Sequence, residues 1–487
     1  MIGWILLGAL ALLVLITVVR AARFKPTARE REAQPSEKVD AERAARHLCE
    51  AITYPTVSYP DPAQMDFDTF HRFHAFLEHS YPLTHQALQR ELIAEASLLY
   101  TWRGTNKKLA PIALLSHQDV VPVSEGTEKA WTHPPFAGHN DGAFIWGRGA
   151  IDMKNHLICV MEAVETLLSE GFAPARTVHL CFGHNEEVVG SEGAGAAAIR
   201  ETLRGRGIRL ESVIDEGGAM LPVHLKGILE HRTLAGIGIS EKGYADFEIT
   251  LHRKGGHSSQ PPKHSGLGEM AEVIRDLERH QFKAKMLPFL RNLLDVAGRC
   301  MSFLPRMVAC NHMLLRPLLV AVLKNIPAAA CLMRSTTAVT MASGSPAANV
   351  LPQNSSVTVN FRMMPGVTTA DVEKHIRKVV RNKDIEVRVL KKKEASPFSP
   401  TDTTAFRTIA RLASGMAEGV MLAPYLVMGG TDACFYEPIC KNVYRFSPFL
   451  ASVELLGCAH ATNERIPVQG LGDAVAFFKR YIRAEAS

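Results

Sequence analysis

Residues 111–119, PIALLSHQD, join a short apolar run to a polar end, and this pattern decides the fold. The same pattern returns at 177–187, TVHLCFGHNEE, and at 210–218, LESVIDEGG, while helical stretches such as 153–169 lie between the runs. Alternation of such strands with helices predicts an α/β sheet with helices on both faces. The polar loops of such a sheet gather at the carboxyl ends of its strands.

Five clusters of histidines and acids follow turns or strands of this kind. They lie at 116–119, 147–154, 183–187, 215–218 and 458–464. Taken singly, each has an ordinary explanation, such as a polar loop, a solvated acidic loop or, for Asp152, a helix N-cap. Together they offer three histidines and several carboxylates, and Cys458 is the single cysteine among them. That set of nitrogen and oxygen ligands suits paired Zn²⁺ or similar divalent ions.

Two spacings within the clusters point to chemistry. Asp119 stands two residues after His117, and a carboxylate close to a metal-binding imidazole fixes its tautomer. Glu186 and Glu187 are adjacent, and adjacent residues of an extended segment point in opposite directions. We therefore expect one glutamate to bind a metal while the other faces the reacting water.

Composition limits the class of protein. The chain has 487 residues, which predicts two domains or one large domain with an insertion. Hydrophobic residues make up 47% and charged residues 21%, as in ordinary globular proteins. A net charge of +6 without a long basic run makes nucleic acid an unexpected partner. Nine scattered cysteines without a C-x-x-C pair argue against a disulfide framework or a thiolate zinc site.

The first 23 residues predict a membrane anchor. Residues 1–19 carry no charge and would span about 28 Å as a helix, at about 1.5 Å per residue. The alternative is a cleaved signal peptide, but no Lys or Arg precedes the apolar run and Arg20 interrupts the cleavage candidate at 21–22. We therefore predict a single-pass membrane protein. The basic residues after the anchor favour the cytoplasmic face, and the other face stays open.

The remaining chain divides by its pattern of residues. Residues 24–39 are polar with two prolines and predict a linker. The α/β pattern occupies 40–241 and returns in 396–487, so we assign both to one catalytic domain. Between them, 242–395 contains period-2 strands and helices of a separate α+β domain, which we expect to be inserted into the first.

An apolar segment lies inside the inserted domain. Residues 286–334 are rich in Leu, Met and Val, with six basic residues against one acid. Buried helices that extend the inserted domain are the simpler interpretation. Alternatively, these helices wall an apolar channel for an acyl chain or rest on a membrane surface.

The motifs, in their order, resemble one enzyme family. SHQDVVP, WGRGAIDMKN, GHNEE, DEGG, GGHSS, ANVLP and GCAHATNE are similar to motifs of the co-catalytic zinc metallopeptidases that include aminoacylase-1, bacterial carboxypeptidase G and succinyl-diaminopimelate desuccinylase. The likeness covers about residues 40–485. SEKGYADFEIT, GHSSQPPK, VNFRMMPG, GGTDACFY and YRFSPF resemble most the branch of vacuolar carboxypeptidase S and the secreted N-fatty-acyl-amino-acid synthase/hydrolase.

This resemblance implies a centre of two zinc ions with Asp152 as the bridge. One zinc would be held by His117, Asp152 and Asp215, and the other by Asp152, Glu187 and His460. Asp119 would orient the first histidine, and Glu186 would be the general base that acts on the bridging water. The family also often has a cis peptide bond after the bridging aspartate.

The resemblance further implies that 242–395 is an α+β ferredoxin-like lid, which also forms dimers in many relatives. His257 of this lid would stabilise the oxyanion, and Asn349 and Arg362 would hold the carboxylate of the substrate. Asn360 departs from the family, because many relatives have aspartate two residues before that arginine. The long insertion favours a monomer in which domain closure brings His257 to the site of its own chain, and a homodimer through the lid is the alternative.

The expected activity is zinc-dependent hydrolysis of an amide in an N-acyl amino acid or a short peptide with a free C-terminal carboxylate. Hydrolysis or synthesis of long-chain N-fatty-acyl amino acids is the alternative within the same class. A membrane-tethered binding protein without activity is a further alternative, but no metal ligand is missing. An aminopeptidase fits less well, since GGHSS and ANVLP point to recognition of a carboxylate rather than an amine.

Overall fold

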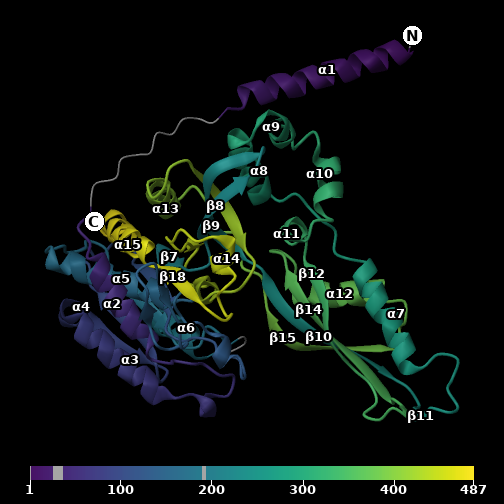
Figure 1. The fold of residues 1–487 in the computed structure, drawn as a ribbon, viewed down its shortest axis with the longest axis horizontal. Helices are drawn as coiled ribbons and strands as arrows, with labels where there is room; N and C mark the ends of the chain where they lie inside the picture. Colours follow the sequence, from purple (N-terminus) through teal and green to yellow (C-terminus); the bar gives the residue numbers. More distant parts are fainter. Residues whose placement is uncertain (1, 26–36, 189–192) are drawn as a thin grey trace.

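The computed structural model describes residues 2–25, 37–188 and 193–487. It consists of a larger domain, a smaller domain and an N-terminal helix that lies along one side (Figure 1). Most of the predicted linker at 24–39 falls outside the described residues.

The larger domain is built on a nine-stranded mixed sheet with the order β1-β2-β6-β3-β7-β17-β9-β16, in which β8 also pairs with β9. The strands are β1 (Gln89–Ile93), β2 (Ser97–Trp102), β3 (Ile112–His117), β6 (Val178–Gly183), β7 (Ser212–Asp215), β8 (Ala219–Leu225), β9 (Leu229–Glu241), β16 (Val420–Val427) and β17 (Val443–Arg445). Neighbours β6, β3, β7 and β17 run parallel, so their carboxyl ends meet at one edge. The predicted α/β sheet is confirmed.

Helices cover both faces of this sheet, because its strands alternate in side-chain direction. Leu114 belongs to one buried core and its neighbours Ala113 and Leu115 to the other. The first core lies under α2 (Ala41–Ile52), α5 (Lys154–Ser169) and α15 (Leu471–Ala486), and the second under α6 (Gly195–Gly205) and the 3-10 helix η3 (Asp432–Tyr436). Other helices of this domain are α3 (Phe67–Ser80), α4 (Pro82–Ala87), α13 (Thr404–Ser414) and α14 (Val453–Leu456).

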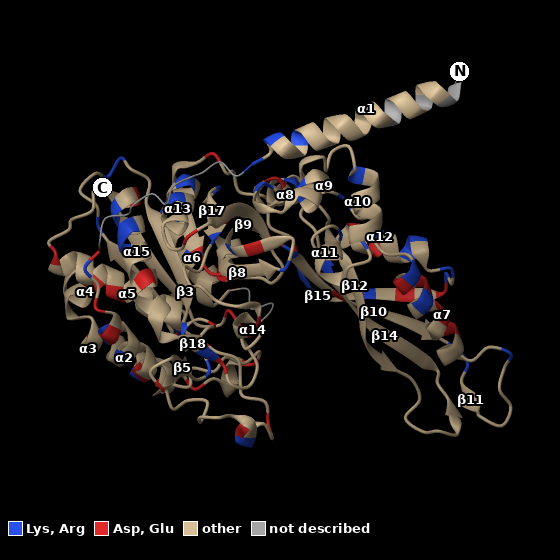
Figure 2. Cartoon of the chain, turned by 45° about the horizontal axis from the view of Figure 1, so that its top comes forward, with Lys and Arg blue, Asp and Glu red and all other residues tan. Residues whose placement is uncertain are grey.

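The smaller domain has its own sheet and core. Its elements are β10 (Gly243–His252), α7 (Gly266–Arg279), β12 (Thr336–Ser343), β14 (Asn354–Met363), α12 (Thr369–Val379) and β15 (Ile385–Lys393). The four strands are antiparallel in the order β12-β14-β10-β15, which is a ferredoxin-like βαββαβ arrangement. Acidic and basic side chains lie next to one another on α7, which is remote from the larger domain (Figure 2). The role of this domain as a lid stays a prediction.

Short strands extend both domains. In the larger domain β4 (His139–Asn140), β5 (Phe144–Trp146) and β18 (Arg465–Pro467) form a three-stranded sheet. In the smaller domain β11 (Gly256–His257) pairs with β13 (Val350–Leu351). Figure 1 places β11 at the end of the smaller domain that is remote from the larger one.

The apolar segment 286–334 forms four helices beside the junction of the domains: α8 (Pro288–Cys300), α9 (Phe303–Cys310), α10 (Arg316–Leu323) and α11 (Pro327–Ala330). On α8, Phe289 and Leu290 are buried in a cluster with Leu426 of β16. The outer helices are more exposed, with Leu304 at 69% and Leu318 at 61% exposure. The segment therefore packs on the larger domain as well as extending the smaller one.

The N-terminal helix α1 (Ile2–Arg23) contacts α9 of this segment, where the Asn311 amide donates a hydrogen bond to the Thr17 carbonyl at 3.3 Å. Within the three described ranges of the chain, no helix combines the length and the apolar character needed to cross a membrane. A span needs about 20 consecutive apolar residues, whereas α1 carries Arg20 and Arg23 in its last turn. The predicted transmembrane anchor and single-pass membrane location are therefore wrong.

Candidate metal centre

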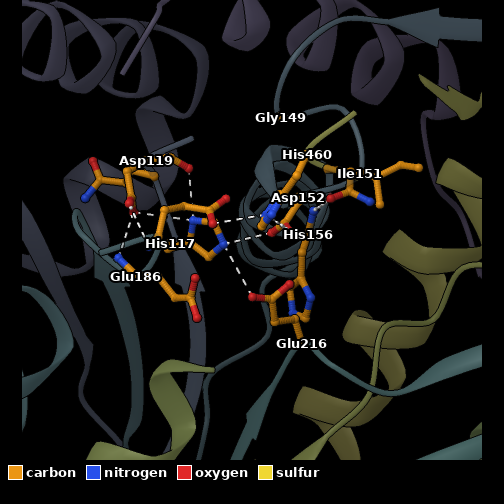
Figure 3. A network of polar contacts seen from close by, with 12 residues as sticks. His117, Asp119, Gly149, Ile151, Asp152, His156, Glu186, Glu216 and His460 are labelled. Atoms are coloured by element: carbon orange, nitrogen blue, oxygen red, sulfur yellow. Dashed lines mark hydrogen bonds and ion pairs between the residues drawn. The ribbon is translucent and has the colours of Figure 1, made fainter. Parts of the chain in front are cut away.

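His117 ends β3 and lies buried at the carboxyl edge of the larger sheet. Its Nδ1 is 2.9 Å from the backbone carbonyl of Asp119, and because a carbonyl only accepts, Nδ1 carries the proton. The free Nε2 faces two carboxylates, at 3.1 Å from Asp152 Oδ1 and 3.3 Å from Glu216 Oε1 (Figure 3). This ring is oriented as a metal-binding histidine requires.

Asp119 connects the ends of β3 and β6. The Ser58 hydroxyl donates to its Oδ2 at 2.6 Å, and the backbone N–H groups of Glu186 and Glu187 donate to its two oxygens at 3.2 and 3.1 Å. Burial alone would raise the pKa of this carboxyl, but its hydrogen bonds hold the pKa below the ordinary value. Asp119 thereby orients both His117 and the glutamate pair.

Asp152 lies between two histidines. Its Oδ1 faces His117, while its Oδ2 is 2.9 Å from His460 Nε2, which is also 3.1 Å from Glu187 Oε2. The peptide bond from Asp152 to Met153 is cis, as the resemblance implied. One carboxylate therefore belongs to two ligand groups, the geometry of a bridging ligand: His117, Asp152 and Glu216 in one, and Asp152, Glu187 and His460 in the other.

The structure places Glu216, rather than Asp215, in the first group. Asp215 ends β7 and is buried, and its oxygens accept hydrogen bonds from the backbone N–H groups of Glu216 at 2.9 Å and Ala433 at 2.7 Å. The chain turns after the strand, so the next side chain reaches His117 instead. The structure thus brings Glu216, and not Asp215, into the first group, and the role of Asp215 as a metal ligand stays a prediction.

Glu186 lies beside the first group and forms, with His117 and Glu187, a third set of side chains close enough to hold a metal ion. Desolvation, and then the neighbouring carboxylates Glu216 and Glu187, raise its pKa well above the ordinary value, against the influence of His117. Desolvation together with Asp152 raises the pKa of Glu216 to about 8. A partly buried group of acids of this kind is stabilised by cations.

Glu464 supports the segment that carries Asp152. It is fully buried, its Oε2 accepts from Arg148 at 2.6 Å, and its Oε1 accepts from the backbone N–H groups of Gly149 and Ile151 at 3.0 and 2.9 Å. Arg148 also donates to the His460 carbonyl at 3.2 Å. Glu464 belongs to the cluster 458–464, and its place in the motif GCAHATNE was the available signal for this contact.

Asp432 is a second residue that the sequence analysis missed. It lies in η3, and within the described part of the chain no group donates to its buried Oδ2. Desolvation and then Asp215 raise its pKa well above the ordinary value. A Cβ at Gly183 would lie 2.3 Å from this Oδ2, so glycine is needed where β6 ends. The motif GGTDACFY, noted only for its family likeness, was the available signal.

Glu241 links the domain junction to this centre. At the end of β9, it accepts from Arg445 Nε at 2.7 Å and from the Thr431 hydroxyl at 2.7 Å, and its other oxygen is 3.4 Å from Lys393 Nζ. Lys393 ends the strand that returns from the smaller domain. Thr431 precedes η3, whose Ala433 N–H holds Asp215.

The residues predicted in the smaller domain lie outside the two ligand groups. His257 is exposed on β11 and contacts the Ser259 hydroxyl at 2.8 Å, and the Asn349 carbonyl accepts from the Ser258 N–H at 3.0 Å. Arg362 lies on β14 with its guanidinium 4.8 Å above the Tyr244 ring. The structure thus brings His257 and Asn349 together, and their roles toward a substrate stay predictions.

Asn360 has a carboxylate partner on the neighbouring strand. Its amide donates to Asp246 Oδ1 at 2.8 Å, and the Tyr244 hydroxyl donates to Asp246 Oδ2 at 2.6 Å. The two residues face each other across β10 and β14. Asn360 is therefore paired with an acid one strand away, close to the ring that Arg362 covers.

A parallel sheet edge that gathers histidines and carboxylates into groups able to hold metal ions is typical of metal-dependent hydrolases. A family model described as Peptidase family M20/M25/M40 matches residues 113–484. The chain belongs to this family of metallopeptidases and is a hydrolytic enzyme.

Curated relatives cover nearly all of the chain. Probable carboxypeptidase S-like 2 of Dictyostelium discoideum is 33% identical over 444 residues, which are 90% of this chain and 84% of that protein. Carboxypeptidase S of Saccharomyces cerevisiae is 33% identical over 485 residues, with 89% and 83% covered. N-fatty-acyl-amino acid synthase/hydrolase of Homo sapiens is 30% identical over 490 residues, with 98% and 95% covered.

Solved structures show the same fold at lower identity. An M20 family metallo-carboxypeptidase from Sulfolobus solfataricus has a TM-score of 0.65 at 18% identity, covering 91% of this chain and 99% of its own. Human carnosine dipeptidase 1 has a TM-score of 0.63 at 13% identity, with 91% and 96% covered.

Proposed function

We propose that this chain is a zinc-dependent amide hydrolase that cleaves N-acyl amino acids or short peptides with a free C-terminal carboxylate. The observation that carries the proposal is the shared Asp152, which faces both His117 and His460 and belongs to two of the three groups of side chains that could hold a metal ion. The names of the relatives, which include carboxypeptidase S, support amide substrates that end in a carboxylate.

The residues fit two divalent cations. Each group offers one imidazole nitrogen and carboxylate oxygens, a ligand set that zinc accepts. Glu187 Oε1 is buried, and no described group of the protein donates to it. One ion would be held by His117, Asp152 and Glu216, and the other by Asp152, Glu187 and His460.

The mechanism assigns a proton to Glu186. Bound divalent cations lower the pKa of an attacking water and polarise a substrate carbonyl. The Glu186 carboxylate takes the proton from that water, the water oxygen attacks the amide carbon, and Glu186 then gives the proton to the departing amine. Asp119 holds the Glu186 backbone during both transfers.

The smaller domain supplies the remaining contacts in this proposal. Asn349 and Arg362 hold the free carboxylate of the substrate, and His257 donates a hydrogen bond to the oxyanion. Since His257 lies at the far end of the smaller domain (Figure 1), these contacts require that domain to close as a lid, or a second copy of the chain to supply the histidine.

Hydrolysis or synthesis of long-chain N-fatty-acyl amino acids is the second candidate. The human relative with that printed name is aligned with 98% of this chain, which favours it. Both candidates use the same centre and differ only in the acyl group.

The test is hydrolysis by the purified chain with and without zinc. We expect a chelator to abolish cleavage of N-acyl amino acids and added zinc to restore it. Glu186→Gln is expected to lower kcat by about 10²–10⁴-fold while metal analysis still finds both ions. Full activity of the metal-free protein would overturn the proposal, and loss of metal in Glu186→Gln would overturn the role of Glu186.

A further inference from the structure

A cavity of about 220 Å³ adjoins the candidate metal centre. The polar part of the cavity wall includes Asp152 and Glu216, which both belong to the first ligand group, and also Asn155. Most of the remaining wall is apolar and includes Ile151, Phe449, Leu450, Leu455, Leu456 and Ile466. A substrate whose amide carbonyl reached the centre would therefore have an apolar space directly beside its reacting carbon.

The cavity belongs to the larger domain alone. All of its lining residues lie within 151–155, 216–219 and 447–470, so its shape does not depend on closure of the smaller domain. Backbone hydrogen bonds hold one wall in place, from the Ser447 N–H to the Gly218 carbonyl at 3.2 Å and from the Ala451 N–H to the Met220 carbonyl at 3.1 Å. The predicted carboxylate contacts, Asn349 and Arg362, lie in the other domain. The two halves of a substrate would thus be recognised by different domains.

The chemistry of the wall selects an uncharged group. No lysine, arginine or histidine is among the described residues that line the cavity, so a second carboxylate would have no partner there. The acids of the wall, Asp152 and Glu216, are ligands in the proposed centre, so the α-ammonium of a dipeptide would have no free anion to pair with. Burying an unpaired charge costs far more than burying an alkyl chain gains.

The volume limits the length of the group. An apolar cavity of about 150 Å³ holds benzene, and a space of about 220 Å³ has room for roughly seven groups the size of a water molecule, at about 30 Å³ each. Leu450 lines the cavity and is also 47% exposed, so the side chain of this residue borders both the cavity and solvent. Methylene groups beyond that point leave the apolar wall.

On the basis of the hydrolase activity proposed above, we infer that this cavity receives the apolar acyl group of an N-acyl amino acid and fits medium-length chains of up to about eight carbons. The site thereby favours blocked, medium-chain substrates over both free dipeptides and long-chain fatty-acyl amides.

The first experiment measures kcat/KM of the zinc-loaded chain on N-acyl leucines from acetyl to hexadecanoyl. We expect a rise of about fourfold for each added methylene, the factor for burying one CH₂ group, up to about octanoyl and no further rise beyond it. Pentanoyl-leucine and norvalyl-leucine differ only by the free amine, and we expect the former to be preferred at least about tenfold, since the unpaired ammonium is penalised.

Variants of the wall test the assignment directly. Ala451→Leu fills part of the cavity and is expected to lower kcat/KM for octanoyl-leucine at least about tenfold, as loss of two buried methylenes would, and to lower it much less for acetyl-leucine. Leu456→Ala enlarges the cavity and should move the plateau to longer chains. Val453→Ala is the matched control, because Val453 lies on the same helix, is 74% exposed and is outside the cavity.

Binding gives a readout without turnover. Octanoate and acetate are titrated into the zinc-loaded Glu186→Gln protein by calorimetry, with acetate as the control for binding of a carboxylate to zinc. Octanoate should bind more tightly than acetate, and Ala451→Leu should remove that difference. If Ala451→Leu does not fold, Leu456→Ala and the pair of leucine substrates still decide the question.

The outcomes separate the inference from the proposed function. Equal kcat/KM for all acyl lengths, a rise that continues to hexadecanoyl, or equal effects of Val453→Ala and Leu456→Ala would overturn the inference while the hydrolase function stands. If the zinc-loaded chain cleaves no N-acyl amino acid and no dipeptide, the proposed function fails, and the inference fails with it.

Discussion

At the scale of single residues, the adjacent acids Asp215 and Glu216 have different tasks. Asp215 is buried and accepts backbone hydrogen bonds from Glu216 and Ala433, whereas Glu216 reaches His117. Neighbouring side chains at a strand end point in different directions. If the strand ended one residue later, the two acids would therefore exchange their positions. The motif DEGG contains both acids, and its letters alone do not tell them apart.

This difference predicts the metal content of two variants. Glu216→Gln should lose the ion of its group, with a large loss of activity, because a carboxylate ligand becomes a neutral amide. Asp215→Asn should retain both ions, since its side-chain oxygen still accepts one backbone hydrogen bond. Metal analysis of the purified variants measures this directly. The assignment would be reversed by a zinc content that falls in Asp215→Asn and stays complete in Glu216→Gln.

A buried histidine predicts how stability depends on pH. His179 on β6 is 2% exposed, and desolvation lowers its pKa to about 4. Its ordinary pKa is about 6.5, so between pH 6.5 and 4 the unfolded chain binds a proton that the folded chain does not. The free energy of unfolding should therefore fall with decreasing pH in this range, by about 1.4 kcal/mol per pH unit from this group.

Denaturant unfolding from pH 7 to 4 measures that slope. In His179→Phe, which keeps an aromatic ring but cannot titrate, the slope should be smaller by about 1.4 kcal/mol per pH unit. His224→Phe, the same replacement at an exposed histidine, is the matched control variant. An unchanged slope in His179→Phe would contradict the prediction.

At the scale of elements, strand β9 and the return from β15 meet at a buried ion network. Glu241 joins Arg445, which has no exposed surface, to Thr431 and Lys393. The Ser396 N–H also donates to the Glu241 carbonyl at 3.1 Å. The two chain connections between the domains, near Glu241 and Lys393, therefore both contact the loop at Thr431, which precedes the Ala433 N–H that donates to Asp215.

Removal of this acid should be strongly destabilising. Glu241→Ala leaves the Arg445 guanidinium buried without its closest anion, which typically costs about 3–5 kcal/mol in the free energy of unfolding. Glu373→Ala is the control, because Glu373 pairs with Arg377 on the exposed surface of α12, where such pairs contribute about 1 kcal/mol or less. Denaturant unfolding of the two variants checks the difference. Equal losses would show that the buried network adds nothing beyond a surface pair.

At the scale of the whole molecule, the centre and the predicted oxyanion histidine lie in different domains. The ligand groups are at the carboxyl edge of the larger sheet, and β11 with His257 is at the far end of the smaller domain (Figure 1). Catalysis as proposed needs a movement about the two connections near Glu241 and Lys393, or a second chain.

We expect His257 to act on the centre of its own chain. The helices α8–α11 add material beside the domain junction, and their contacts with both domains favour closure within one chain. His257→Ala and Glu186→Gln, each inactive alone, should therefore stay inactive when mixed. Recovery of activity on mixing would show that the histidine is supplied by a second chain, as in a homodimer.

The sequence by itself determined the α/β class and the residues that gather at the sheet edge. The α/β class and these residues can be recognised from short stretches of sequence, because a strand, a turn and a polar end follow each other within about ten residues. The clusters that contain His117, Asp152, Glu187 and His460 were found in this way, and the family resemblance implied their roles as ligands. The structure brings all four side chains into the groups that could hold a metal ion. The family followed from the order of the same motifs.

Only the tertiary structure placed Glu216 beside His117 and showed the contacts of Glu464, Asp432 and Glu241 and the cavity beside the candidate centre. Each depends on side-chain direction or on contacts between residues far apart in the chain, such as Arg148 with Glu464. The remote position of His257 and the failure of the predicted membrane anchor were likewise decided by the structure. Local patterns specify elements and ligand types, whereas packing between distant segments specifies which atoms meet.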